Sequence, residues 1–190
     1  MSAAQAPLFD LPPTGPPGLA YRPDLIAPDE ERDLVERLGA LPFAPFVFRG
    51  YEGRRRVVSF GLRYDFSGQG LVQAAPIPDW LRPVRDRAAA FAGLPGEAFA
   101  HLLINEYRPG APIGWHRDRP AFDKVVGVSL LAPTTMRFRR RVGDRFERIN
   151  VPIAPRSAYL LDGPARHDWE HSLPEARAHR YALTFRNLSG

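Results

Sequence analysis

HLLINEYRPGAPIGWHRD, residues 101–118, begins the stretch that decides the fold class. Its first seven residues form a predicted strand, which ends at the turn sequence Arg108-Pro109-Gly110. Further short strand-like segments follow closely, without intervening helices. This spacing favours an antiparallel sandwich or jelly roll. The later predicted strands cover 125–131, 135–141, 146–151, 157–163, 167–173 and 180–188, with Val142-Gly143-Asp144 as a hairpin loop.

The N-terminal half of the chain adds two predicted helices. Acidic residues crowd the start of segment 28–41, and apolar residues recur on one face of this segment and of 79–93. Segment 46–66 lies between them and mixes short strand-like pieces with glycines and arginines, so we interpret it as hairpins or loops rather than core. The predicted buried faces carry Leu34, Val35, Leu38 and Leu41 in the first helix and Trp80, Val84, Ala88 and Phe91 in the second.

Length and composition predict one domain. Proline and glycine dominate residues 1–18, which we expect to form a flexible tail, and residues 19–190 then form a single, mostly β domain with flanking helices. The chain has no cysteine, so a bound metal must use nitrogen and oxygen ligands. No apolar run or leader-like segment is evident, so we expect a cytoplasmic protein, and a monomer.

The positive charge of the chain comes almost entirely from arginine. The net charge is +5, and Lys124 is the only lysine. Arginine matches phosphate geometry and stacks on bases, which favours a polyanionic partner. A bias towards Ala, Gly, Pro and Arg explains the same charge equally well, so the charge alone leaves both interpretations open.

The motif His116-Arg117-Asp118 predicts a metal site. Side chains two apart on an extended backbone face the same way, so an imidazole and a carboxylate share one space. A second histidine would complete a facial triad, which leaves three octahedral positions for oxygen and a co-substrate on iron(II). The chain offers four further histidines, of which His167 and His171 share one predicted strand and one face, and spacing does not separate these two.

Arginines on the last predicted strand suggest an anionic ligand. Alternation places Arg180, Ala182, Thr184 and Arg186 on one face of 180–188. Arg180 and Arg186 are about 20 Å apart along the strand, so they could meet a short diacid from opposite ends. The alternative is a half-exposed strand whose arginines lie in water. Asn105 and Tyr107 share one face of the first strand and suit hydrogen bonding to a keto acid.

The order of these motifs resembles the AlkB family of iron(II)/2-oxoglutarate-dependent dioxygenases. The resemblance covers roughly residues 20–188 and runs from Asn105-x-Tyr107 through His116-x-Asp118 and the Trp-Glu-His-Ser-Leu-Pro sequence at 169–174 to the last strand. It implies a double-stranded β-helix, that is, a jelly roll. It implies that iron(II) binds His116, Asp118 and His171, because the family context selects His171 over His167.

The resemblance also implies how 2-oxoglutarate binds. Arg180, helped by Tyr107, would pair with the distal carboxylate, and Arg186 with Asn105 would serve the end nearer the metal. The family usually carries Asn or Ser where this chain has Ala182, so we expect weaker 2-oxoglutarate binding. An unpaired polar neighbour typically costs about 1–3 kcal/mol.

The function implied is oxidative demethylation of alkylated DNA or RNA bases with Fe(II), 2-oxoglutarate and O2. Segment 46–66 occupies the place of the family's nucleotide-recognition lid, where Tyr64 and Phe66 would stack on a flipped base or simply pack on the sheet. Two rival functions are an oxygenase that acts on protein or a small molecule, and a nucleic-acid-binding module without turnover. Candidate substrate contacts are Arg63, Arg137 and Arg139.

Overall fold

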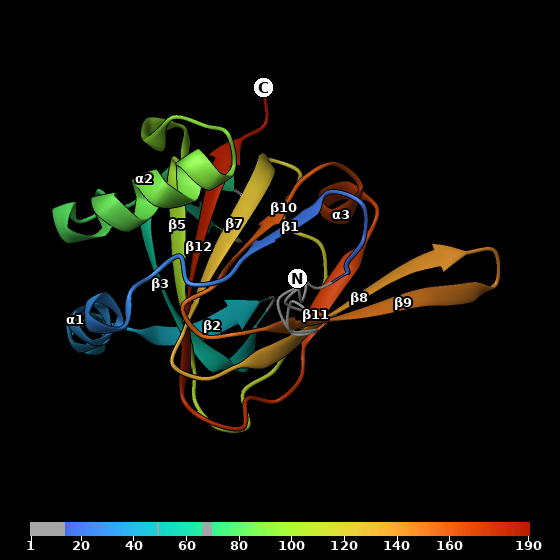
Figure 1. The fold of residues 1–190 in the computed structure, drawn as a ribbon, viewed down its shortest axis with the longest axis horizontal. Coiled ribbons are helices and arrows are strands. Elements are labelled where there is room, and N and C mark those ends of the chain that lie inside the picture. Colours follow the sequence, from blue (N-terminus) through green and yellow to red (C-terminus); the bar gives the residue numbers. More distant parts are fainter. Residues whose placement is uncertain (1–13, 49, 66–69) are drawn as a thin grey trace, which may run out of the picture.

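Two antiparallel sheets form the body of the protein (Figure 1). The computed structural model describes residues 14–48, 50–65 and 70–190. The major sheet has eight strands in the order β1-β10-β7-β12-β5-β3-β2, with β4 paired to β3, and the minor sheet has the order β6-β11-β8-β9. The strands are β1 (Leu19–Arg22), β2 (Ala44–Phe48), β3 (Tyr51–Asp65), β4 (Gly70–Gln73), β5 (His101–Tyr107), β6 (Ile113–His116), β7 (Phe122–Leu130), β8 (Thr134–Val142), β9 (Arg145–Ile153), β10 (Ala158–Leu161), β11 (Glu170–Leu173) and β12 (Arg180–Leu188). The predicted antiparallel jelly roll is therefore confirmed.

Helices cover one face of the major sheet. Two helices, α1 (Pro28–Gly39) and α2 (Arg82–Phe91), each bury one apolar face against this sheet. Two 3-10 turns flank α2, namely η1 (Asp79–Leu81) and η2 (Gly96–Ala98). Leu34 and Leu38 of α1 are buried in this core, as are Val84 and Ala88 of α2. Both predicted helices are confirmed, although α2 begins only at Arg82, with Pro83 in its first turn, and Asp79–Leu81 forms the 3-10 turn.

Strand β12 is buried on both faces. It pairs with β5 on one side and with β7 on the other, so it lies inside the major sheet. Tyr181, Leu183 and Phe185 pack in the core under the helices. Arg180 and Arg186 point to the opposite face, where they are 2% and 8% exposed. The predicted alternation is confirmed, and the alternative with arginines in water is wrong because the second sheet covers them.

Segment 46–66 was predicted to form hairpins or loops rather than core. The hairpins are confirmed, since β3 pairs antiparallel with β2 and β4, but the segment does not lie outside the core sheet. Most of it belongs to the fifteen-residue strand β3, which pairs with β5 from Arg56 to Gly61 and so extends the major sheet. The polar sequence is tolerated because neighbouring elements supply partners: Arg56 donates to the carboxylate of Glu106 at 2.8 Å. Phe66 and the tail residues 1–13 lie outside the described residues.

Residues 167–173 do not form one strand, again contrary to our prediction. A short helix, α3 (Gly163–His167), comes first, and β11 begins only at Glu170. The Asp162 carboxylate accepts a hydrogen bond from the Gly163 amide at the start of α3, and a proline follows in the first turn. His167 and His171 therefore do not share a strand face.

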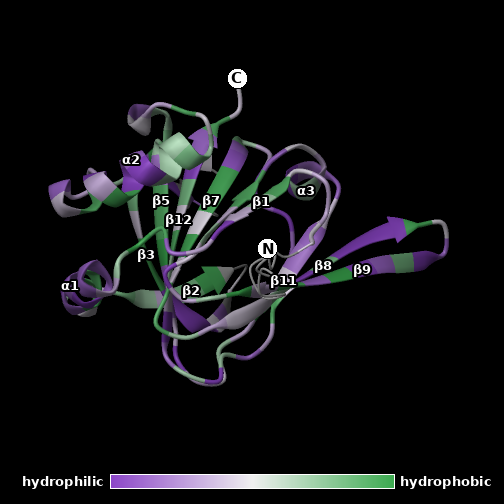
Figure 2. Cartoon of the chain, in the orientation of Figure 1, coloured by the Kyte–Doolittle hydropathy of each residue, from purple (hydrophilic) through white to green (hydrophobic). Residues whose placement is uncertain are grey.

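The β8–β9 hairpin projects from the body on the side away from α1 and α2 (Figure 1). Its strands stay paired from Thr134↔Ile153 to Val142↔Arg145, which confirms the predicted tight loop. Much of the projecting part is hydrophilic (Figure 2). Among the described residues, no helix is long and apolar enough to cross a membrane.

Candidate metal centre and co-substrate pocket

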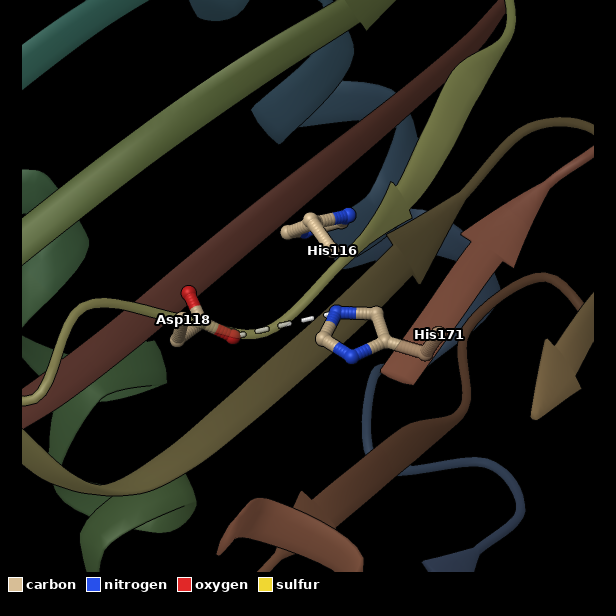
Figure 3. Close-up of side chains that lie close together, drawn as sticks. All are labelled: His116, Asp118 and His171. Carbon is tan, nitrogen blue, oxygen red and sulfur yellow. Dashed lines mark ion pairs between the residues drawn. The ribbon is translucent and has the colours of Figure 1, made fainter. Parts of the chain in front are cut away.

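His116, Asp118 and His171 converge between the two sheets. His116 ends β6, Asp118 follows two residues later, and His171 lies opposite His116 on the paired strand β11. One ligand atom from each residue lies within 4.8 Å of the others. Figure 3 shows the three side chains pointing towards one another, with the Asp118 Oδ2 and His171 Nε2 atoms 3.7 Å apart. Two imidazoles and one carboxylate at this spacing could hold a metal ion.

His167 is not part of this cluster. It ends α3, its side chain is 52% exposed, and its Nε2 lies 3.7 Å from the Asp123 carboxylate. His179 instead contacts the buried Glu106, and His101 stacks on Phe122. The geometry thus separates the two candidates that spacing left open.

The protonation states suit metal binding. Burial, together with the neighbouring His116, lowers the pKa of His171 to about 3. Burial also lowers the pKa of His116. The Nδ1–H of neutral His116 is placed to donate to the carbonyl of Gly114 at 2.8 Å, which leaves the Nε2 lone pair free. Both imidazoles can therefore act as neutral ligands at neutral pH.

Arg186 keeps Asp118 ionised. Burial acts to raise the pKa of Asp118, but the Arg186 guanidinium and the two histidines outweigh it and hold the pKa below its usual range. Arg186 Nη2 lies 2.6 Å from Asp118 Oδ1, whereas Oδ2 faces His171. Each carboxylate oxygen thus has a separate partner, and the second oxygen stays directed at the candidate metal position.

Arg180 lies at the other end of the same sheet face. Its Nε donates to Ser129 Oγ at 3.0 Å, and its guanidinium carbon lies 5.1 Å from the centre of the Tyr107 ring. Its Nη1 is buried and has no hydrogen-bond partner within the described part of the chain. A buried, unpaired guanidinium nitrogen fits an incoming carboxylate, because such a donor is costly to leave unsatisfied.

Asn105 is held between two neighbours. Its Oδ1 accepts from Arg55 Nη1 at 2.9 Å, and its Nδ2 faces Thr184 Oγ1 at 3.5 Å. Arg55 is a site residue that was not predicted from the sequence, because it lies in the segment that we interpreted as hairpins or loops rather than core. The alternation of Arg55 with Val57 and Ser59 would have placed it on this face if the segment had been interpreted as a strand.

A cavity of about 900 Å³ connects these groups. It is lined by the three candidate metal ligands and by Asn105, Tyr107 and Arg186, so most of the predicted site residues meet in one space. Arg180 does not line the open cavity itself, but it lies over the ring of Tyr107, which does. Further arginines line it, namely Arg55, Arg63, Arg117, Arg119 and Arg166, so the cavity suits anions.

The predicted substrate residues lie in different places. Arg63 is exposed and lines the cavity. Arg137 and Arg139 lie on the face of β8 opposite the buried Met136 and Phe138. Both are near the ring of Trp115, whose centre is 5.5 and 4.5 Å from their guanidinium carbons. The side chains of Tyr64 and Phe66 lie outside the described residues.

Fold and site together define a class of protein. A jelly roll that carries two histidines and one carboxylate in a ligand cavity is the arrangement of non-haem iron(II) oxygenases. The family model of the 2OG-Fe(II) oxygenase superfamily matches residues 18–186. The chain belongs to this superfamily, and it is an AlkB-like dioxygenase that uses Fe(II), 2-oxoglutarate and O2.

Named relatives give the same family. The human "DNA oxidative demethylase ALKBH2" is 30% identical over 87% of this chain and 68% of its own length. The zebrafish "Probable RNA/DNA demethylase ALKBH6" is 30% identical over 77% of this chain and 59% of its own length. The solved structure of OsALKBH1 has a TM-score of 0.66 at 16% identity and covers 92% of this chain and 100% of its own, which supports the fold.

Proposed function

We propose that His116, Asp118 and His171 bind the iron and that the enzyme oxidatively demethylates alkylated nucleic-acid bases. The observation that carries the proposal is the three-ligand cluster inside an arginine-lined cavity. The names of the ALKBH2 and ALKBH6 relatives support demethylation of nucleic acid. Bound Fe(II), O2 and 2-oxoglutarate supply hydroxylation of an N-linked methyl group, which then leaves as formaldehyde.

The protein residues hold and orient the reactants. His116, Asp118 and His171 would hold the iron, which would supply the oxidation chemistry with 2-oxoglutarate and O2. Arg180 and Tyr107 bind the distal carboxylate of 2-oxoglutarate, and Asn105 with Arg186 serves the end nearer the metal. Arg186 also donates a hydrogen bond to the Asp118 carboxylate. Its second role is therefore to hold Asp118, the carboxylate that binds the metal, in position.

The nucleic acid approaches over the rim of the cavity. Arg63 lines the opening, and the outer face of β8 carries Arg137 and Arg139 beside Trp115, which also lines the cavity. The Phe146 ring on β9 continues this row, with its centre 4.7 Å from the Arg139 guanidinium carbon. Guanidinium groups bind phosphates and aromatic rings stack on bases, so this face suits the flanking strand. Tyr64 and Phe66 remain proposed contacts to a flipped base.

The decisive test is product release with a panel of oligonucleotides. The protein is incubated with Fe(II), ascorbate and 2-oxoglutarate, and methylated single- and double-stranded DNA and RNA are each added. We expect formaldehyde and succinate in equal amounts with at least one methylated oligonucleotide and none above background with its unmethylated counterpart. The absence of formaldehyde across the panel, with 2-oxoglutarate still bound, would contradict the nucleic-acid assignment.

A second candidate function is oxidation of a protein or small molecule. One observation favours it: Arg139 donates to the Glu170 carboxylate at 2.7 Å, and Arg137 donates to Ser172. These arginines have partners within the chain, so they are less available to phosphates. Under this alternative, charge changes on β8 leave turnover of the true substrate unchanged.

A binding module without turnover would bind the oligonucleotides and consume no oxygen. We further propose a monomer in the cytoplasm.

A further inference from the structure

Tyr159 on β10 is a buried phenol for which the reaction outlined above has no role. Its side chain lines the cavity although the residue is only 7% exposed. It pairs across the sheet with Gly127 of β7, and its ring lies over that glycine. A Cβ atom on Gly127 would be 2.2 Å from Tyr159 Cζ and 2.3 Å from the hydroxyl oxygen. The missing side chain at Gly127 therefore makes room for the phenol.

The strand register brings this phenol next to β12, in the row of Thr184 and one same-face position from Ala182. Gly127 is the partner of Thr184 on β12, and Ala182 is the next residue of β12 that faces the same way. The end of the Tyr159 ring, with its hydroxyl, lies over Gly127 of β7, the strand beside β12. Ala182, Tyr107 and Tyr159 all belong to one buried cluster. The absent side chain at Gly127 thus leaves space for the phenol over β7, on the sheet face that Ala182 shares.

The surroundings of the hydroxyl favour a hydrogen-bond donor. Burial raises the pKa of Tyr159, and the charge of Arg180 only partly offsets this effect. The phenol therefore stays protonated at neutral pH. Arg180 and Tyr107 are also the residues assigned to the distal carboxylate, and the Nη1 of Arg180 has no hydrogen-bond partner among the residues that the structure describes.

We propose that the Tyr159 hydroxyl donates a hydrogen bond to the distal carboxylate of 2-oxoglutarate and replaces the polar side chain that Ala182 lacks. The inference rests on the proposed roles of Arg180 and Tyr107. It revises the expectation from the sequence that Ala182 weakens co-substrate binding, because the missing polar group comes from a different strand.

The test measures binding rather than turnover. 2-Oxoglutarate is titrated calorimetrically into the Fe(II)-loaded protein without oxygen, and 2-oxobutyrate, which lacks the distal carboxylate, is titrated in parallel. We expect Tyr159→Phe to weaken 2-oxoglutarate binding about ten- to a hundredfold, the range for a hydrogen bond to a charged group. Binding of 2-oxobutyrate should stay the same, whereas a general disturbance of the pocket would weaken both ligands.

Two further variants sharpen the result. Tyr181→Phe removes a buried phenol from the opposite face of the sheet and should change neither ligand. Adding Ala182→Asn to Tyr159→Phe should restore part of the 2-oxoglutarate affinity. Unchanged 2-oxoglutarate binding in Tyr159→Phe, or equal loss of both ligands, overturns the role of Tyr159. If Arg180→Met binds 2-oxoglutarate as tightly as the wild type, Arg180 does not bind the distal carboxylate. That result would overturn both the proposed role of Arg180 and this inference.

Discussion

Asp118 links the metal position to the rest of the sheet. Its Oδ2 faces His171 and its Oδ1 contacts Arg186, which is itself buried in the central strand β12. The Asp118 ligand, which lies in the turn between β6 and β7, is therefore positioned by a residue of the major sheet. Removing a residue that hydrogen-bonds to a metal ligand commonly weakens metal binding about 10- to 100-fold.

The ligand assignment predicts which histidine is essential. His116→Ala, Asp118→Ala and His171→Ala should each abolish Fe(II) binding and succinate release, because two protein ligands do not complete the facial site. Both can be measured, the first by anaerobic calorimetry and the second by product analysis. His167→Ala is the matched control, since His167 lies outside the cluster beside Asp123. Loss of iron binding in that control would contradict the assignment.

His101 gives a pH-dependent stability. Burial lowers its pKa to about 3, against about 6.5 in the unfolded chain. As the pH falls below 6.5, the unfolded state binds a proton that the folded state does not, so stability falls until about pH 3. At pH 5 this one residue costs about 2 kcal/mol relative to pH 7.

Urea unfolding of the iron-free protein checks this prediction. The free energy of unfolding is compared at pH 7 and pH 5 for the wild type and for His101→Gln, which keeps a polar side chain near Arg186. The variant should lose about 2 kcal/mol less on acidification than the wild type. An equal loss in both proteins would show that His101 titrates normally in the folded state.

At the level of elements, the β8–β9 hairpin combines charge with aromatic rings. Arg139 and Arg148 both lie near the ring of Phe146, 4.7 and 5.8 Å from its centre. Arg141 alternates with Arg139 on β8, and its side chain is 70% exposed. The outer face of this hairpin thus offers several cations at the side of the cavity that Trp115 lines.

Removing two of these charges should weaken nucleic-acid binding. Arg139→Gln with Arg141→Gln keeps a hydrogen-bonding group opposite Glu170 and removes two positive charges. Binding of a single-stranded oligonucleotide should weaken, and the slope of log K against log salt should become shallower by about 1.4 if both contact phosphates. Fluorescence anisotropy at several salt concentrations measures both quantities.

The control for this pair carries the same change of charge elsewhere. Arg22→Gln with Arg82→Gln alters two exposed arginines on β1 and α2. Its salt slope should match that of the wild type. Equal slopes in all three proteins would favour a substrate other than nucleic acid.

Helices and strands were predicted best where the local pattern of apolar and polar residues matched the faces that the fold buries. Strand β12 was predicted with its bounds and faces because the alternation of apolar and polar residues survives burial on both sides. Strand β3 was missed because Arg56 needs Glu106, a partner fifty positions away. The break before β11 was missed because α3 begins directly after the apolar strand β10, and the predicted strand 157–163 ran on through Asp162 and Gly163.

The site was predictable in part for similar reasons. His116 and Asp118 are near in sequence, so extended geometry alone brings them together. The choice of His171 needed the family resemblance, since α3 is not evident from spacing. Arg55 and Tyr159 reach the cavity only through the order of strands in the sheet, which no local pattern specifies.

At the scale of the whole molecule, ligand binding should stabilise the fold. The metal and co-substrate positions draw on β5, β6, β11 and β12, so bound ligand ties the two sheets together. A ligand that binds only the folded state at a hundred times its dissociation constant adds about 2.7 kcal/mol. For a domain of this size, the melting temperature should rise by about 5–10 °C.

Thermal unfolding without oxygen tests this coupling. Fe(II) should raise the melting temperature, and 2-oxoglutarate should raise it further only when Fe(II) is present. In Asp118→Ala the rise with Fe(II) should disappear. A full rise in that variant would mean that the metal binds elsewhere.

The projecting hairpin has a consequence for how such enzymes diverge. Its outer half lies away from the body, and the three candidate metal ligands come from β6, β11 and the turn between β6 and β7 (Figure 1). Inherited changes near Gly143 can therefore accumulate while the oxidising centre stays intact. A duplicated gene could acquire a new target by altering this hairpin alone, and the ancestral reaction would pass unchanged to both descendants.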